Sequence, residues 1–270
     1  MPELPEVETT RRGIEPHIKK HTVTGVTVRE PRLRWPVTPL LGNKLIGQRV
    51  LSVVRMAKYL LIQLQEGYLL VHLGMSGSLR IVNADTALRK HDHVEIVFDN
   101  GAILRYHDPR RFGCVLWISD IKGHPLLDSL GVEPLGDEFS GDYLYERSRN
   151  RKGPVKNFIM DGHIVVGVGN IYANESLFLA GIHPNRAAGR VSRLRYQGLA
   201  EQIRIVLARA IEAGGSTLRD FVNSDGNPGY FAQSLNVYGR AGLPCVRCRE
   251  PLSESRLGQR ATVYCKTCQR

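Results

Sequence analysis

Residues 50–73 read VLSVVRMAKYLLIQLQEGYLLVHL, three short apolar runs separated by residues that favour turns. The runs cover Val50–Val54, Tyr59–Leu64 and Tyr68–Leu73. Short apolar runs bounded by turn residues predict β-strands, and the pair Glu66-Gly67 between the last two is a weak hairpin signal. This stretch therefore predicts that the N-terminal part of the chain is a β domain.

The same β pattern extends outward, from about Val23 to Ile118. Further apolar runs lie at Val94–Phe98, Ile103–Tyr106 and Val115–Ile118. Asn100-Gly101 joins two of these runs, and Asn-Gly supplies the positive φ angles that a tight hairpin needs. Short strands at this spacing predict a sandwich or a barrel. Ahead of the strands, Glu6 to Ile14 is expected to form a helix that holds the N-terminus against the body.

The pattern becomes helical after about Leu130. One expected helix runs from Asn170, its capping residue, to Ala180, and Gly181 stops it. A second has one apolar face and ends at Gly214-Gly215; the face comprises Leu199, Ile203, Val206, Leu207, Ala210 and Ile211. The second part of the chain is therefore expected to be a helical domain.

Four of the five cysteines lie within the last 26 residues, as Cys245-x2-Cys248 and Cys265-x2-Cys268. Two such pairs place four thiolates at the corners of a tetrahedron, the arrangement of a closed zinc site. The pattern predicts one structural Zn²⁺, and the alternative is a pair of redox dithiols. Cys114 lies in an apolar run and is expected to be buried packing.

The chain carries 37 Lys and Arg against 26 Asp and Glu, a net charge of +11. A basic excess suggests a polyanionic partner, although charge alone does not separate DNA from RNA, an anionic membrane or a generic basic surface. No apolar run approaches the roughly 18 residues that span a bilayer. The acidic start MPELPEVE has no apolar core, so no signal peptide is expected. We expect a monomer in the cytoplasm without membrane association.

Pro2 follows Met1, and removal of Met1 would expose a secondary amine. Only an unprotonated amine attacks a carbon centre. At pH 7.5 about a quarter of an ordinary α-amine is unprotonated, against about one lysine in a thousand. Glu3, beside it, is a candidate general acid or base. The alternative is an ordinary processed terminus. With Met1 retained, the Pro2 nitrogen is an amide and cannot attack.

Eight motifs, in order along the chain, resemble those of the bacterial formamidopyrimidine-DNA glycosylase family. They are MPELPEVETTRRGIEPH, AKYLL, HLGMSGSLR, DPRRFG, VGVGNIYANE, SDGNPGYFAQ, VYGR and QRAT-x2-C-x2-C. The resemblance implies an α+β fold: an N-terminal β-sandwich with an N-terminal helix, a helix–two-turn–helix domain, and a C-terminal β-ribbon zinc finger. We place these three domains at residues 1–132, 133–236 and 237–270.

The resemblance also implies a reaction. The family removes oxidised purines from duplex DNA, such as 8-oxoguanine and formamidopyrimidines, and then cleaves the abasic site by β,δ-elimination. By this resemblance Pro2 is the Schiff-base nucleophile at C1′, and Glu3 donates protons. Lys58 contacts phosphate and assists β-elimination, while Arg260 binds phosphate and assists δ-elimination. The implied partner is damaged double-stranded DNA, which places the protein at the bacterial nucleoid.

Further residues match positions of the family that bind DNA. Met75, Arg110 and Phe112 would fill the gap left by the extruded nucleotide; the alternatives are core packing for the two apolar residues and a solvated pair for Arg110-Arg111. Asn170, with Ile171 and Tyr172, would hold phosphates at a helix N-terminus. The remaining expected contacts are His91, Arg111, Arg151 and Lys156, and a lesion loop that contains Thr217, Ser224, Gly226 and Tyr230.

Two other functions remain open. One is a non-catalytic zinc-ribbon DNA-binding protein, which would have no reason to retain Pro2, Glu3, Lys58 and Arg260 together. The other is the related glycosylase for oxidised pyrimidines, whose start resembles Pro-Glu-Gly-Pro-Glu-Ile. Residues 2–7 instead read Pro-Glu-Leu-Pro-Glu-Val, which favours the purine enzyme. A second metal at His91-x-His93 with His107-Asp108 is disfavoured because no further cluster closes the site.

Overall fold

The computed structural model describes residues 2–215 and 235–270. The chain folds into two compact units. Of the described residues, the first unit holds 2–128 and 213–215, and the second holds 129–212 and 235–270. The finer division into three domains at 132 and 236 stays a prediction.

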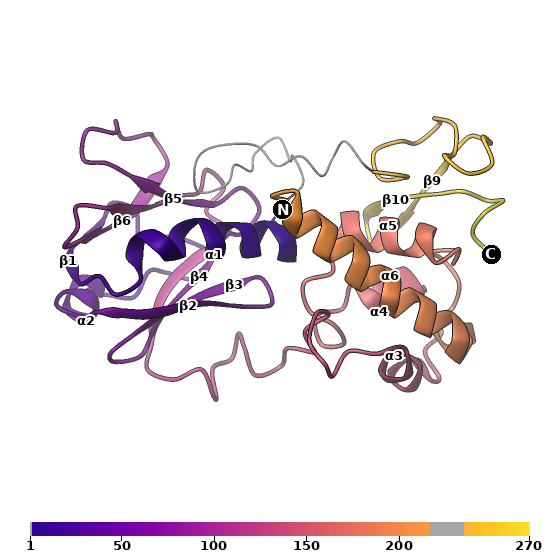
Figure 1. The fold of residues 1–270 in the computed structure, drawn as a ribbon, viewed down its shortest axis with the longest axis horizontal. Helices are drawn as coiled ribbons and strands as arrows, with labels where there is room; N and C mark the ends of the chain where they lie inside the picture. The colour runs from indigo at the N-terminus through magenta and orange to yellow at the C-terminus, as the bar shows by residue number, and fades with distance from the viewer. Residues whose placement is uncertain (1, 216–234) are drawn as a thin grey trace. The chain divides into compact units, whose positions relative to one another are not determined.

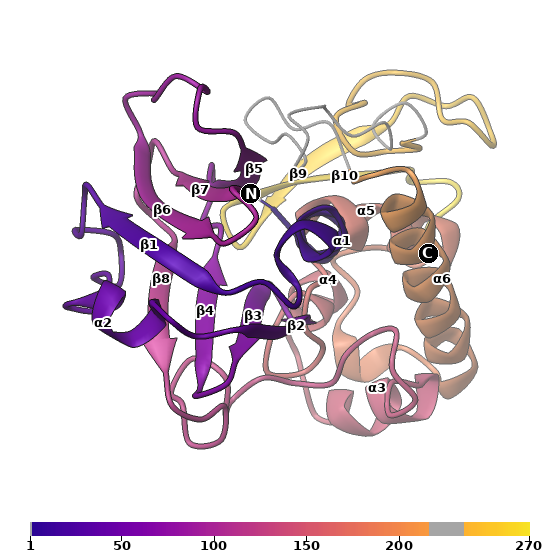
Figure 2. The ribbon, with the colours of Figure 1, turned by 60° about the vertical axis from the view of Figure 1, so that its left-hand side comes forward.

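The first unit contains two four-stranded antiparallel sheets, drawn as two layers in Figure 2. One has the strand order β2-β3-β4-β8, and the other has the order β1-β6-β7-β5. The strands of the first sheet are β2 (Val50–Met56), β3 (Tyr59–Leu64), β4 (Tyr68–His72) and β8 (Cys114–Ile118). Those of the second are β1 (Val23–Val28), β6 (Asp92–Phe98), β7 (Ile103–His107) and β5 (Ser78–Val82). The predicted β-sandwich is confirmed.

Two tight turns set the strand register in this sandwich. Between β6 and β7, Gly101 has the positive φ that Asn100-Gly101 predicts, at +81°, whereas the φ of Asn100 is not positive, so the expected pair of left-handed residues is found at Gly101 alone. The turn between β2 and β3 consists of Ala57 and Lys58, and Ala57 has a φ of +55°. The β2–β3 turn therefore projects Lys58 from the end of a hairpin.

Helix α1 (Leu4–Ile18) lies along the sandwich in Figures 1 and 2, and a short helix, α2 (Leu41–Leu45), follows β1. Val7, Ile14 and Ile18 of α1 join one buried apolar cluster with residues of both sheets, including Leu60 and Leu104. The helix is longer at both ends than the predicted Glu6–Ile14. The buried apolar side chains along one face of α1 hold the N-terminus against the sandwich.

The second unit contains the remaining helices and the C-terminal ribbon. The helices are α3 (Gly141–Ser148), α4 (Val155–Ile159), α5 (Asn170–Leu179), the 3₁₀ turn η1 (Ala188–Arg190) and α6 (Arg193–Glu212). The predicted apolar face of α6 is buried along its whole length. For α5, the N-cap is Gly169 rather than Asn170, so the predicted capping residue is wrong by one position. The Asn170 side chain instead donates to the Ala261 carbonyl.

Strands β9 (Ser253–Leu257) and β10 (Arg260–Tyr264) pair antiparallel and form the expected β-ribbon. The turn between them is Gly258-Gln259, both with positive φ. Phe178 of α5 packs in one buried cluster with Val263 and the cysteines of the ribbon. Within residues 2–215 and 235–270, we find no helix of the length and apolar character that crossing a membrane requires.

Substitution of Leu60, which is fully buried between the sheets, tests the importance of the sandwich core. Leu60→Ala should lower the free energy of unfolding by about 2–5 kcal/mol, because it leaves a cavity. Leu51→Ala on the neighbouring strand removes a side chain that is 44% exposed and should cost about 0.5 kcal/mol or less. Urea unfolding of both variants measures the difference, and equal losses would contradict this account of the core.

Candidate active site and zinc centre

Pro2 and Glu3 are buried immediately ahead of α1, although they stand at the start of the chain. The Glu3 backbone N–H donates to Glu6 Oε2 at 2.8 Å, and Glu6 is itself fully buried. The Pro2 nitrogen therefore lies at a fixed place, at the buried N-terminal end of α1.

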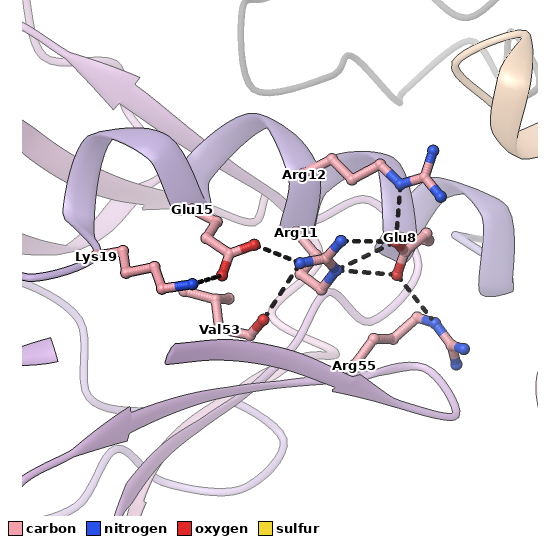
Figure 3. A network of polar contacts seen from close by, with 7 residues as sticks. All are labelled: Glu8, Arg11, Arg12, Glu15, Lys19, Val53 and Arg55. Carbon is pink, nitrogen blue, oxygen red and sulfur yellow. Dashed lines mark hydrogen bonds and ion pairs between the residues drawn. The ribbon is translucent and has the colours of Figure 1, made fainter. Parts of the chain in front are cut away.

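Lys58 is half-buried in the β2–β3 turn, and a polar network connects this hairpin to α1 (Figure 3). Arg55 donates to the Ala57 carbonyl at 2.9 Å, beside Lys58, and its Nε lies 3.4 Å from Glu8 Oε2 on α1. Arg11 also binds Glu8 and reaches the carbonyl of Val53 on β2. The helix that begins after Glu3 is thus tied to the strand that leads to Lys58.

The ionisation of Glu8 keeps this network charged. Burial alone would raise the pKa of Glu8, but hydrogen bonds from Arg11 and Arg12 and the charge of Arg55 lower it below its ordinary value. Arg11 binds a second carboxylate, Glu15, on the same face of the helix. The connection between α1 and β2 therefore persists as an ionic network at neutral pH.

His72 lies opposite Tyr59 in the sheet, at the end of β4, and is not among the site residues predicted from the sequence. Burial, followed by the positive charges of Lys58 and Arg34, lowers the pKa of His72 to about 4. Its Nδ1 accepts a hydrogen bond from the Gly74 N–H at 3.0 Å. A neutral imidazole thus stands within the field of Lys58. The motif HLGMSGSLR, which begins at this histidine, is the signal that could have found it.

The low pKa of His72 predicts a pH-dependent stability. The unfolded chain takes up a proton on this imidazole below about pH 6.5, whereas the folded chain does so only near pH 4. The His72 contribution to the free energy of unfolding is therefore complete above pH 6.5 and declines between pH 6.5 and pH 4. His72→Asn retains an acceptor for Gly74 and does not titrate, so its decline should be shallower. Urea unfolding at pH 7 and pH 5 measures this, and an equally steep decline would contradict it.

The structure brings Met75, Arg110 and Phe112 together on two touching loops. Met75 is 36% exposed and Phe112 is 41% exposed, so core packing does not account for either side chain. The Arg110 guanidinium lies over the Phe112 ring, 4.8 Å from its centroid. Arg111 is exposed and pairs with Glu30 at 3.2 Å. These loops therefore present two apolar tips and a cation at one place on the first unit.

A hollow of about 560 Å³ lies next to these tips. Four of its six lining residues are arginines, Arg32, Arg34, Arg110 and Arg111, and the other two are the apolar residues Leu33 and Phe112. Of these arginines, Arg32 and Arg111 share Glu30 as an acidic partner. A concave surface with several guanidinium groups around an aromatic ring suits a phosphate backbone with bases beside it.

His91 is half-buried, and its ring lies about 6 Å from the rings of His93 and His107. His93 Nε2 is hydrogen-bonded to the Asp108 carbonyl, and His107 Nδ1 to Asp92. These nitrogens are therefore engaged in holding β6 and β7. Across the described ranges, only the four C-terminal cysteines form a group able to hold a metal, so no second metal site is found there.

In the second unit, Lys156 and Asn170 both contact the strand that begins at Arg260. The Lys156 ammonium is buried and donates to the Ala261 carbonyl at 3.0 Å and to Thr262 Oγ1 at 2.7 Å. Asn170 Nδ2 donates to the same carbonyl at 3.1 Å. Arg260 itself is exposed. Lys156 therefore faces the ribbon, where it supports the strand that presents Arg260.

The other expected contacts of this unit fall into two groups. Ile171 and Tyr172 are buried within α5, while Arg151 is exposed and lies against the Phe158 ring. Thr217, Ser224, Gly226 and Tyr230, the predicted lesion loop, lie outside the described residues.

The four cysteine sulfurs at the C-terminus lie within 4.8 Å of one another. Cys245 and Cys268 are 4.0 Å apart, and Cys248 and Cys265 are 3.4 Å apart. A tetrahedral zinc–thiolate site requires sulfurs about 3.8 Å apart. Backbone N–H groups of Arg247 and Cys268 point to the sulfurs of Cys245 and Cys265, as they do toward bound thiolates. The residues fit one structural Zn²⁺, which leaves no open position for chemistry.

Zinc should be present at one ion per chain and should hold the ribbon together. Cys265→Ser should lose the metal, because three thiolates no longer close the tetrahedron, and the segment 242–270 should become sensitive to trypsin. Cys114→Ser, a buried cysteine far from the cluster in sequence, should keep one zinc. Metal analysis with limited proteolysis measures both, and an intact ribbon after verified zinc loss would refute the structural role.

Together these features define a protein with a β-sandwich unit, a helical unit and a zinc ribbon. Residues 1–115 match the formamidopyrimidine-DNA glycosylase N-terminal domain, and residues 130–222 match the H2TH domain of the same family. Residues 242–270 match a zinc finger found in FPG and IleRS. The chain therefore belongs to the formamidopyrimidine-DNA glycosylase family, which confirms the resemblance, the fold and the zinc site predicted from the sequence.

Individual relatives agree over the full length. The formamidopyrimidine-DNA glycosylases of Alcanivorax borkumensis and Marinobacter nauticus are 63% and 59% identical, with all of both chains covered. The crystal structure of the MutM (Fpg) protein from Thermus thermophilus matches with a TM-score of 0.89 and 37% identity, covering 99% of this chain and 98% of that one. A Lactococcus lactis FPG mutant with Fapy-dG containing DNA matches with a TM-score of 0.92 and 32% identity, with both chains fully covered.

Proposed function

We propose that this chain is a bifunctional DNA repair enzyme that excises oxidised purines, such as 8-oxoguanine and formamidopyrimidines, from double-stranded DNA and then cleaves the abasic site. The observation that carries the proposal is the burial of Pro2 and Glu3 at the start of α1, on a helix joined by Glu8 and Arg55 to the hairpin of Lys58. Structures of the Lactococcus lactis relative with Fapy-dG containing and abasic DNA support the substrate class.

The first step joins the protein to the sugar. After Met1 is removed, the Pro2 nitrogen donates its lone pair to C1′, and the bond from C1′ to the base breaks. The base leaves with a proton, and Glu3 is the adjacent group able to supply protons to the departing base and to the opening sugar ring. Because a secondary amine forms a permanently charged iminium at C1′, electrons can then be withdrawn from the sugar.

The second step breaks the backbone. Loss of a proton from C2′ expels the 3′ phosphate by β-elimination, and a further elimination expels the 5′ phosphate. Both leaving groups are anions, so cations beside them assist. Lys58 at the β2–β3 turn and Arg260 at the start of β10 are the cations that we assign to the two phosphates. Lys156 and Asn170 hold the carbonyl next to Arg260.

Recognition of the duplex depends on extrusion of the damaged nucleotide, which costs a few kcal/mol. The exposed tips of Met75 and Phe112 would enter the vacated space, and Arg110 would bond the base left without a partner. The arginine-lined hollow beside Phe112 would receive the backbone of the undamaged strand. With a net charge of +11, the enzyme would act as a monomer on the nucleoid in the bacterial cytoplasm.

Borohydride trapping tests the nucleophile. Reduction during turnover on a duplex with 8-oxoguanine should give a covalent conjugate, and mass spectrometry should locate the link at Pro2. Pro2→Gly should trap on the order of 100-fold more slowly, because a flexible glycine amine misplaces the reacting nitrogen.

Protein that retains Met1 is the matched control, since its Pro2 nitrogen is an amide and should give no conjugate. A link on an internal side chain, or equal trapping by the Met1-retaining protein, would overturn the assignment.

A further inference from the structure

We infer that Asp108, through Ser76, is the positioning residue that fixes the Met75 loop and the Arg110–Phe112 loop to each other. The inference rests on the proposed function, because it concerns the side chains that would fill the gap in the duplex. Asp108 is not assigned to the reaction itself. Its role would be to let the exposed tips enter the DNA as one rigid element.

The Asp108 carboxylate, which is fully buried, reaches both loops. Its Oδ1 accepts the Ser76 hydroxyl at 3.0 Å, and Ser76 directly follows Met75. Its Oδ2 accepts the Gly113 N–H at 2.9 Å, and Gly113 directly follows Phe112. One charged group therefore joins the backbone positions beside the two apolar tips.

Ser76 adds a second connection to the same loop. Its Oγ accepts the Arg110 N–H at 3.3 Å while its proton is donated to Asp108. Arg110, the third of the gap-filling residues, is thus also held by Ser76 and Asp108. The Asp108 backbone is anchored on the sandwich, since its N–H donates to the His91 carbonyl and its own carbonyl binds His93. Asp108 and Ser76 therefore connect the two loops to the sheet.

The two loops also touch through their backbones. A Cβ at Gly74 would lie 2.5 Å from the Gly113 nitrogen, and a Cβ at Gly113 would lie 1.9 Å from the Tyr106 hydroxyl. Gly74 has a φ of +63°. The absence of side chains at these glycines brings the loops close enough to share one carboxylate. Packing alone would allow the loops to slide, whereas hydrogen bonds to a buried anion are directional.

The Tyr106 hydroxyl is a further hydrogen-bonding neighbour of the Asp108 carboxylate. It lies 3.1 Å from Asp108 Oδ2 and is buried, and burial followed by the negative charge of Asp108 raises the pKa of Tyr106 well above its ordinary value. The donors around the carboxylate include Ser76, Tyr106 and the Gly113 N–H. An amide in place of the carboxylate would set its own N–H₂ against one of these donors, so Asp108→Asn should loosen a loop without emptying the space.

The test compares two substrates in single-turnover borohydride trapping. One is a duplex with 8-oxoguanine, from which the nucleotide must be extruded. The other is a single strand with a preformed abasic site, in which no gap has to be filled. Asp108→Asn should trap the duplex roughly tenfold or more slowly, the loss expected for a charged hydrogen bond, and should trap the single strand at the wild-type rate.

Asp92→Asn is the matched control. Asp92 is a buried carboxylate on the same sheet, bonded to His107 and Arg80 rather than to the loops. It should leave the ratio of the two rates unchanged. Ser76→Ala is a milder change and should also lower the rate of trapping on the duplex. It replaces Asp108→Asn in the test if that variant does not fold. In a Met75→Ala/Phe112→Ala background, Asp108→Asn should have little further effect, because the tips that it positions are gone.

Each of the following results would overturn the inference: equal losses on both substrates, an equal change in the ratio of rates with Asp92→Asn, or additive losses when Asp108→Asn is added to Met75→Ala/Phe112→Ala. The inference would also be refuted if Asp108→Asn and Ser76→Ala both trapped the 8-oxoguanine duplex at the wild-type rate and kept the wild-type ratio of duplex to single-strand rates. That result would leave the proposed function intact. Failure of the wild-type protein to trap either substrate would instead refute the proposed function.

Discussion

The burial of the first residues of the chain is the constraint on which the rest of the site depends. Chain termini are ordinarily among the most mobile parts of a domain, which makes them poor places for a nucleophile. Here residues 2–7 are buried, and Val7, Ile14 and Ile18 extend the buried stripe of α1 into the core of the sandwich. An amine at such a terminus combines the low pKa of an α-amino group with the fixed geometry of an interior side chain.

Buried or half-buried charged groups stand behind three of the assigned functional positions. Arg55, paired with Glu8, bonds the turn of Lys58; Asp108 bonds the loops of Met75 and Phe112; and Lys156 bonds the strand of Arg260. In each case the charged group bonds at least one backbone atom of the segment, and this bond helps to fix the path of the chain there. Hydrogen bonds to ions are shorter and stronger than neutral ones, which suits them to segments that are otherwise exposed.

Local patterns explain what could be predicted from the sequence. Apolar runs marked most strands, and the spacing of four cysteines marked the metal, because both signals lie within a few residues. Strand β5 was missed, because Arg80 interrupts its apolar pattern. The buried Arg80 side chain donates to Asp92 on another strand, a partner that the local sequence does not reveal. His72 was likewise not recognised as a site residue, and Asp108 was considered only for a second metal site, which was disfavoured. Their partners become neighbours only when the sheets form, whereas the roles of Pro2, Lys58 and Arg260 rested on the family resemblance.

The ribbon illustrates why a metal and a helix are both needed to place one arginine. A segment of about 30 residues cannot bury enough apolar surface to fold alone, so zinc supplies the missing stability. Zinc does not orient the ribbon, however. The orientation comes from α5: Asn174 accepts the Val263 N–H of β10, and Glu175 accepts four hydrogen bonds from residues 236–238. Because Lys156 and Asn170 also donate to the Ala261 carbonyl, Arg260 projects from a strand whose position is determined from within the helical unit.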